Sequence, residues 1–86
     1  MARAIHLTPR GVVTDDPALF EELKKYLRSK GVKFKELKDE RWYKCYVSGI
    51  TGGDLLRLTR LFAEQVGNTE VWLFMSRVYP PGRGML

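Results

Sequence analysis

The chain has 86 residues, of which 44% are hydrophobic and 29% are charged, and its formal net charge is +5. This length fits one domain and excludes a second core, and the composition excludes general disorder. The single cysteine, Cys45, cannot form an internal disulfide, and no leader-like segment opens the chain, so we expect a cytoplasmic protein. The longest apolar run, residues 71–75, is too short to span a membrane. Asparagine and glutamine occur once each, which favours a thermophilic source.

The first half of the chain predicts a strand, a helix and a second strand. Residues 4–7 form a short strand that resumes at residues 12–13, after a stretch rich in turn-forming residues. Asp16, followed by proline, is suited to cap the start of a helix that ends at Gly31. Residues 32–37 alternate apolar side chains with lysine, which is the period of a strand.

The second half repeats this order. A tight turn at residues 39–40 leads into a strand at residues 42–48, which completes a hairpin. A helix is predicted from about residue 54 to residue 66, since its apolar residues recur at helical spacing. Residues 71–78 are β-prone and form the last strand.

The order βαββαβ predicts an α+β ferredoxin-like sandwich, in which two helices cover one face of a four-stranded antiparallel sheet. The first and third strands are central in this arrangement, and the second and fourth are edges. We assign residues 1–79 to this single domain and residues 80–86 to a flexible C-terminal tail, because the tail's prolines and glycines cannot continue a sheet.

The hairpin turn decides which side chains lie beneath the helices. A two-residue turn at residues 39–40 places Leu37 opposite Trp42 and Lys35 opposite Lys44, a like-charge pair that costs stability. The side chains expected beneath the helices are Val32, Phe34, Tyr43, Cys45 and Val47. Those expected on the uncovered face are Lys33, Lys35, Leu37, Trp42, Lys44 and Tyr46.

The outer strands are assigned in the same way. Ile5 and Leu7 fit the helix side of the first strand and leave His6 on the uncovered face. The last strand is apolar on both sides. We expect Val71, Leu73 and Met75 on its inner side, with Trp72, Phe74 and Ser76 on the uncovered face.

A concentration of positive charge suggests an anionic partner. Residues 24–44 contain nine basic and three acidic residues. Lysines on the uncovered face would neutralise phosphates and its aromatic rings would stack bases, so we predict a small basic nucleic-acid-binding module for RNA or single-stranded DNA. The predicted binding residues are Lys33, Lys35, Trp42, Lys44, Tyr46 and Trp72. The alternative interpretation is that the lysines only keep a helix and an edge strand soluble.

Other motifs carry weaker signals. The base-stacking signature of RNA-recognition modules matches residues 41–48 only at Arg41 and Tyr43, so the likeness stops at topology and face chemistry. We predict no catalytic residue, no cofactor and no metal site, because the lone His6 and Cys45 have no cluster of carboxylates at ligand spacing. A small-molecule-binding regulatory domain is a further alternative, since the fold class hosts many functions.

The last strand favours a second function. Residues 71–75 carry no charge and no proline, so an uncovered edge strand of this sequence is prone to aggregate. We therefore predict a homodimer in which Trp72 and Phe74 lie at the interface. The alternative to nucleic-acid binding is thus a non-catalytic homo-oligomeric or protein-interaction domain that assembles through the last strand and the uncovered face.

Overall fold

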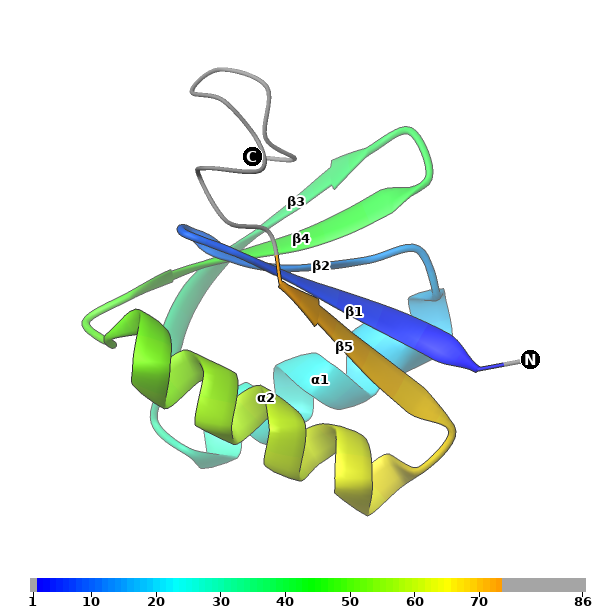
Figure 1. Cartoon of the computed structure of the whole chain (residues 1–86). Helices are drawn as coiled ribbons and strands as arrows, with labels where there is room; N and C mark the ends of the chain where they lie inside the picture. The colour runs from blue at the N-terminus through cyan, green and yellow to red at the C-terminus, as the bar shows by residue number, and fades with distance from the viewer. Residues whose placement is uncertain (1, 74–86) are drawn as a thin grey trace.

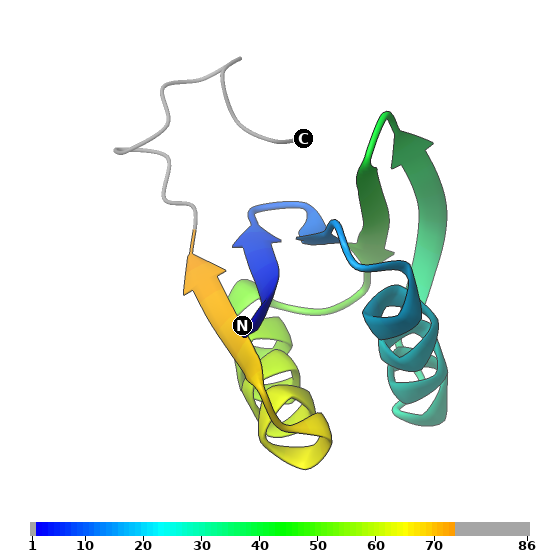
Figure 2. The ribbon, with the colours of Figure 1, turned by 90° about the vertical axis from the view of Figure 1, so that its right-hand side faces the viewer.

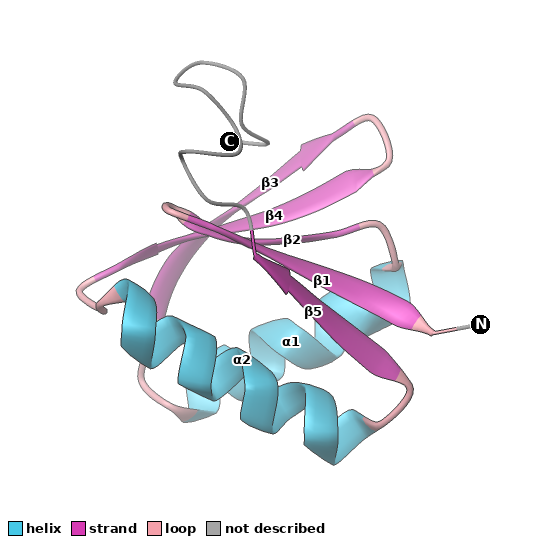
Figure 3. Ribbon diagram, in the orientation of Figure 1, coloured by secondary structure: helices cyan, strands magenta, loops and turns pink. Residues whose placement is uncertain are grey.

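The computed structural model describes residues 2–73 and shows two helices against one face of a five-stranded sheet (Figure 1; Figure 3). In chain order the elements are β1 (Arg3–Thr8), β2 (Gly11–Thr14), α1 (Pro17–Ser29), β3 (Lys33–Asp39), β4 (Trp42–Ser48), α2 (Gly52–Val66) and β5 (Thr69–Leu73). The strand order across the sheet is β3-β4-β2-β1-β5, with β1 and β5 parallel and the other neighbours antiparallel. The α+β class is confirmed, but the prediction of a four-stranded antiparallel ferredoxin-like sheet is wrong.

The extra strand exists because the chain reverses direction after Thr8 instead of continuing past an irregularity. The Thr8 hydroxyl oxygen accepts hydrogen bonds from the N–H groups of Arg10 (3.2 Å) and Gly11 (3.1 Å), which closes the turn. β2 then lies between β1 and β4, and all four of its residues are buried. A side chain at Gly11 would place its Cβ 1.9 Å from the backbone oxygen of Cys45, so this close approach requires glycine.

Both helices start with capping side chains. Asp16 accepts a hydrogen bond from the Leu19 N–H at 2.9 Å and is followed by proline, as the sequence predicts. α2 begins two residues earlier than predicted, because Thr51 caps it by accepting from the Asp54 N–H at 3.1 Å. Within residues 2–73, neither helix is long and apolar enough to cross a bilayer.

The core lies between the helices and the sheet (Figure 2). α1 packs beneath β2 and β4, and α2 packs beneath β5. The buried residues of the core are Ile5, Leu7, Val12, Leu19, Phe20, Leu23, Leu27, Cys45, Leu55 and Phe62. The partly buried side chains packed against it include Val32, Phe34, Tyr43, Val47 and Val71. The predicted inner faces of the hairpin and of the first strand are therefore confirmed. Leu73 differs, because it is 47% exposed at the end of its edge strand.

The β3–β4 hairpin turns one residue later than predicted. Its turn residues are Glu40, which has a φ of 53°, and Arg41, so that Asp39 lies opposite Trp42. The Lys38 ammonium donates a hydrogen bond of 2.6 Å to the Glu40 carbonyl, which ties the strand end to the turn.

This later turn shifts the register by two residues and corrects the predicted pairs. Lys35 lies opposite Tyr46, not opposite Lys44, and Leu37 lies opposite Lys44. A shift of two residues leaves every side chain on its predicted side of the sheet. It also removes the like-charge pair of lysines, which is a physical reason for this register.

Both edges of the sheet carry the strands expected there. β3, with its lysines, is one edge and β5 is the other. The described residues end before Phe74. They therefore do not include the predicted continuation of the last strand to residue 78 or the predicted tail at residues 80–86.

Candidate nucleic-acid interface

The open face is the side of the sheet that neither helix covers (Figure 2). Residues paired across neighbouring strands point to the same side, so the open face is built of rows that cross the strands. The first row is Lys35, Tyr46, Gly11 and Thr8. The middle row is Leu37, Lys44, Val13, His6 and Trp72. In the third row, Asp39 and Trp42 lie at one edge of the sheet, and Ala4 and Glu70 lie at the other.

The basic corner of the open face consists of Lys33, Lys35 and Tyr46. Both lysines are exposed on the edge strand, and neither forms an ion pair with any residue between positions 2 and 73. Tyr46 is half-buried directly opposite Lys35. Arg10 lies at the same end of the sheet, where its carbonyl accepts a hydrogen bond of 3.0 Å from the Val47 N–H. Its side chain is exposed. Two of the predicted lysines and one predicted aromatic residue are thus brought together.

Lys44 lies on the open face, as predicted, but its charge is already engaged. The residue is only 9% exposed, and its Nζ lies 3.5 Å from the Asp39 carboxylate. Its neighbours in the middle row, Leu37 and Val13, are apolar. Lys44 is therefore less available to a phosphate than the exposed Lys33 and Lys35.

Trp42 is also on the open face, and its ring is occupied by protein contacts. Its ring meets the His6 ring edge-on, with centroids 5.6 Å apart and planes at 79°. The Arg41 guanidinium carbon lies 5.0 Å from the Trp42 ring centroid. The guanidinium of Arg41 therefore occupies the place over the indole that a stacked base would take. We therefore assign Trp42 to the support of the sheet, where it contacts His6, the partner of the fully buried Val13 on the neighbouring strand.

Trp72 is the most exposed large apolar side chain of the described chain, at 53%. It lies on β5, at the opposite edge of the sheet from Lys33 and Lys35. Four strand spacings separate the two edges, which amounts to about 19 Å. Trp72 therefore does not belong to the basic corner.

The far end of the open face is acidic. Asp39 and Glu70 belong to the third row, and Asp15 directly follows β2 at the same end. All three are exposed, and on the open face the lysine nearest to them, Lys44, is paired with Asp39. The open face therefore changes from basic to acidic along the direction of its strands.

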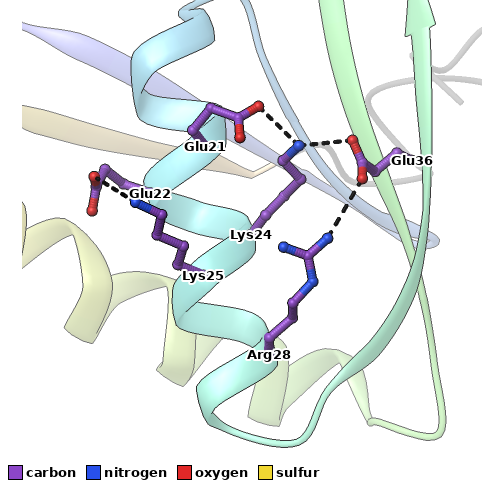
Figure 4. Close-up of polar contacts among 6 residues, drawn as sticks. All are labelled: Glu21, Glu22, Lys24, Lys25, Arg28 and Glu36. Atoms are coloured by element: carbon purple, nitrogen blue, oxygen red, sulfur yellow. Dashed lines mark hydrogen bonds and ion pairs between the residues drawn. The ribbon is translucent and has the colours of Figure 1, made fainter.

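On the helix side of β3, basic residues of α1 form ion pairs with Glu36 (Figure 4). Lys24 places its Nζ 2.8 Å from carboxylate oxygens of both Glu21 and Glu36, and Arg28 lies 3.6 Å from the second oxygen of Glu36. The hydrogen bonds that the Lys24 ammonium donates to Glu21 and, second, to Glu36 raise the pKa of Lys24. Four of the nine basic residues in residues 24–44 therefore have acidic partners within the fold: Lys24, Lys25, Arg28 and Lys44.

Cys45 and His6 also have shifted pKa values. Burial raises the pKa of the Cys45 thiol to about 12, so the thiol stays protonated at neutral pH. Burial also lowers the pKa of His6, against the opposing charge of Asp15. Within residues 2–73, no three His, Cys, Asp or Glu side chains gather in a group that could hold a metal ion.

Comparisons with known proteins identify no relative of this chain. No protein-family model matches the chain, and no curated protein and no solved structure matches it. A function must therefore be inferred from the chemistry of the molecule's own surfaces, and the basic corner offers positive charge that has no acidic partner within residues 2–73.

Proposed function

We propose that the chain is a nucleic-acid-binding module that holds single-stranded RNA or DNA on the basic corner of the open face. One observation carries the proposal: two exposed lysines without an acidic partner in the described chain stand beside Tyr46. A phosphate backbone supplies the negative charge that these lysines lack, and a tyrosine ring offers a stacking surface for a base.

The proposal narrows the set of predicted binding residues. Lys33, Lys35 and Tyr46 remain in it as ligands. Lys44 and Trp42 support the fold through Asp39, His6 and Arg41, as their contacts indicate. Exposed Arg10, which the sequence did not single out, is a further cation at the same end of the sheet.

A single strand suits this surface better than a duplex. Tyr46 is half-buried within a row of the sheet, so a base must leave its stack to reach the ring. Single strands, loops and ends offer such bases, whereas a duplex keeps them stacked. The cationic surface of the corner is also small, and it gives way to acidic side chains at the far end of the face.

The proposal is tested by titrating labelled mixed-sequence oligonucleotides with the protein at several salt concentrations. Replacing both Lys33 and Lys35 with glutamine should reduce the slope of log affinity against log salt by about 1.4, since each phosphate contact contributes about 0.7 for single strands. The matched control replaces Lys25 and Lys30, which are exposed on α1 and at its end, and changes the net charge equally. Undetectable binding at low salt, or equal losses in both variants, would contradict the proposal.

The exposed β5 edge favours a second function, assembly with another copy of the chain. Trp72 is 53% exposed and Leu73 is 47% exposed, and β5 pairs on one side only, with β1, within the described sheet. Light scattering of the wild type and of a Trp72→Lys variant tests this proposal. A wild-type monomer at micromolar concentration would refute the homodimer, and a variant that stays dimeric would refute this surface.

A further inference from the structure

We infer that the basic corner binds two consecutive phosphates of a short single-stranded segment, with the intervening base on Tyr46. A longer strand then leaves the sheet at Leu37. The inference rests on the nucleic-acid-binding function proposed above, and it adds the length and the position of the bound segment.

The spacing of the two lysines supports two adjacent phosphates. Lys33 and Lys35 are alternate residues of β3, so both point to the open face, and their Cα atoms are about 6.7 Å apart along the strand. This separation is close to that of neighbouring phosphates in an extended nucleic-acid strand. Both side chains are exposed, and in residues 2–73 no carboxylate pairs with either of them.

The cross-strand pairing supports the position of the base. Tyr46 lies directly opposite Lys35, and such partners have Cβ atoms about 5 Å apart. On its other side, Tyr46 pairs with Gly11, which has no side chain. No side chain of β2 therefore stands beside the Tyr46 ring in this row. A base attached between the two phosphates can lie over the ring from the β3 edge.

The next residues of β3 limit the length of the bound segment. On the open face, Lys33 and Lys35 are followed by Leu37, which is apolar and 47% exposed, and then by the exposed Asp39. A third phosphate would face a leucine and a fourth would face a carboxylate that already holds Lys44. Since like charges repel, the strand gains no further contact in this direction.

A length series tests the segment directly, with oligothymidylates of increasing length as the probe. Affinity should rise up to three nucleotides, which contain two bridging phosphates, and beyond that only with the number of equivalent positions on the strand. The salt slope should be about −0.7 for a dinucleotide, which has one bridging phosphate, and about −1.4 for three nucleotides and for every longer strand. A slope that keeps increasing with length would overturn the two-phosphate segment and leave the proposed function standing.

An added lysine extends the test. Leu37→Lys should steepen the salt slope by about 0.7 for a five-nucleotide strand and leave a trinucleotide unchanged, because only the longer strand has a third phosphate to offer. The matched control is Leu61→Lys on α2, where the leucine is 49% exposed on the helix side. Equal effects of the two substitutions would overturn the placement of the strand along β3.

A final pair of measurements separates nucleic acid from free phosphate chains. Tyr46→Leu should weaken trinucleotide binding by roughly 5- to 150-fold, the loss expected for one stacked base, and leave inorganic tripolyphosphate binding unchanged. Equal effects on both ligands would overturn the position of the base. If no single strand binds at low salt, the proposed function itself fails, whichever way tripolyphosphate behaves.

Discussion

The basic residues on the two sides of β3 differ in whether they have acidic partners. On the helix side, Glu36 accepts contacts from Lys24 and Arg28, and these charges are compensated within the chain (Figure 4). On the open side, Lys33 and Lys35 have no acidic partner in the described chain. Compensated charges join α1 to the sheet, whereas uncompensated ones are available to a partner. Net charge alone cannot separate these two uses, because it counts both sides together.

The largest expected loss of stability comes from a substitution in β2, the strand that lies between β1 and β4. Gly11→Ala should lower the free energy of unfolding by about 3 kcal/mol or more, because its Cβ would collide with the backbone oxygen of Cys45. Urea denaturation measures the loss. Gly53→Ala is the matched control, since a Cβ there meets no atom within 4 Å, and it should be neutral or slightly stabilising. Equal stabilities of the two variants would contradict the close approach of β2 to β4.

A smaller loss of stability is expected when only the ion pairs on the helix side of β3 are removed. Glu36→Gln removes the ion pairs with Lys24 and Arg28, and it should cost about 1 kcal/mol, because Lys24 is largely buried. The difference from wild type should shrink at high salt, since screening weakens the native pairs. A difference that persists unchanged in molar salt would show that packing, not charge, joins α1 to β3.

The open side should show its own dependence on pH through His6. Burial lowers its pKa below the ordinary value of 6.5, so the unfolded chain binds the proton more readily than the native one. The stabilising contribution is therefore complete above pH 6.5 and is lost as the pH falls through the lowered pKa. Urea denaturation at about pH 7.5 and about pH 5.5 measures it. His6→Gln should remove this part of the pH dependence, because the chain contains one histidine.

The smallest effect on stability is expected at the basic corner itself. Lys33→Gln and Lys35→Gln should each change the free energy of unfolding by less than about 0.5 kcal/mol, since both side chains are exposed and lack acidic partners within residues 2–73. The same variants should weaken binding of single strands. Unfolding curves and titrations on one preparation would test the contrast, and a large loss of stability would show that these lysines support the fold.

The features predictable from the sequence were those with a local cause. Asp16 caps α1 because the carboxylate and the following proline act within one turn. The sides of β3 and β4 follow from a period of two, which survives a shift of two residues. The strand count failed at the turn after Thr8, where Val12 and Val13 are buried on opposite sides of a new central strand. A pair of valines is compatible both with a continuation of β1 and with a separate strand that runs back beside β1.

The candidate site was predictable in part, for a related reason. Lys33, Lys35 and Tyr46 could be placed on the open face from alternation alone. The engagement of Lys44 by Asp39 depends on the turn beginning at Glu40, whose positive φ of 53° is unusual for glutamate. No local sequence pattern predicts such a turn. The ion pair between Lys44 and Asp39 therefore could not be predicted without the register of the β3–β4 hairpin.

The parallel pairing of β1 with β5 affects how the chain is synthesised. Arg3 donates a hydrogen bond of 3.2 Å to the carbonyl of Gly67, 64 positions further along the chain. As the chain leaves the ribosome, the hairpins β1–β2 and β3–β4 can form from nearby residues, but the second side of β1 stays unpaired until β5 has emerged. The sheet is therefore completed last at its N-terminal strand. In native-state hydrogen exchange, we expect the amides of β5 to lose protection before those of β2.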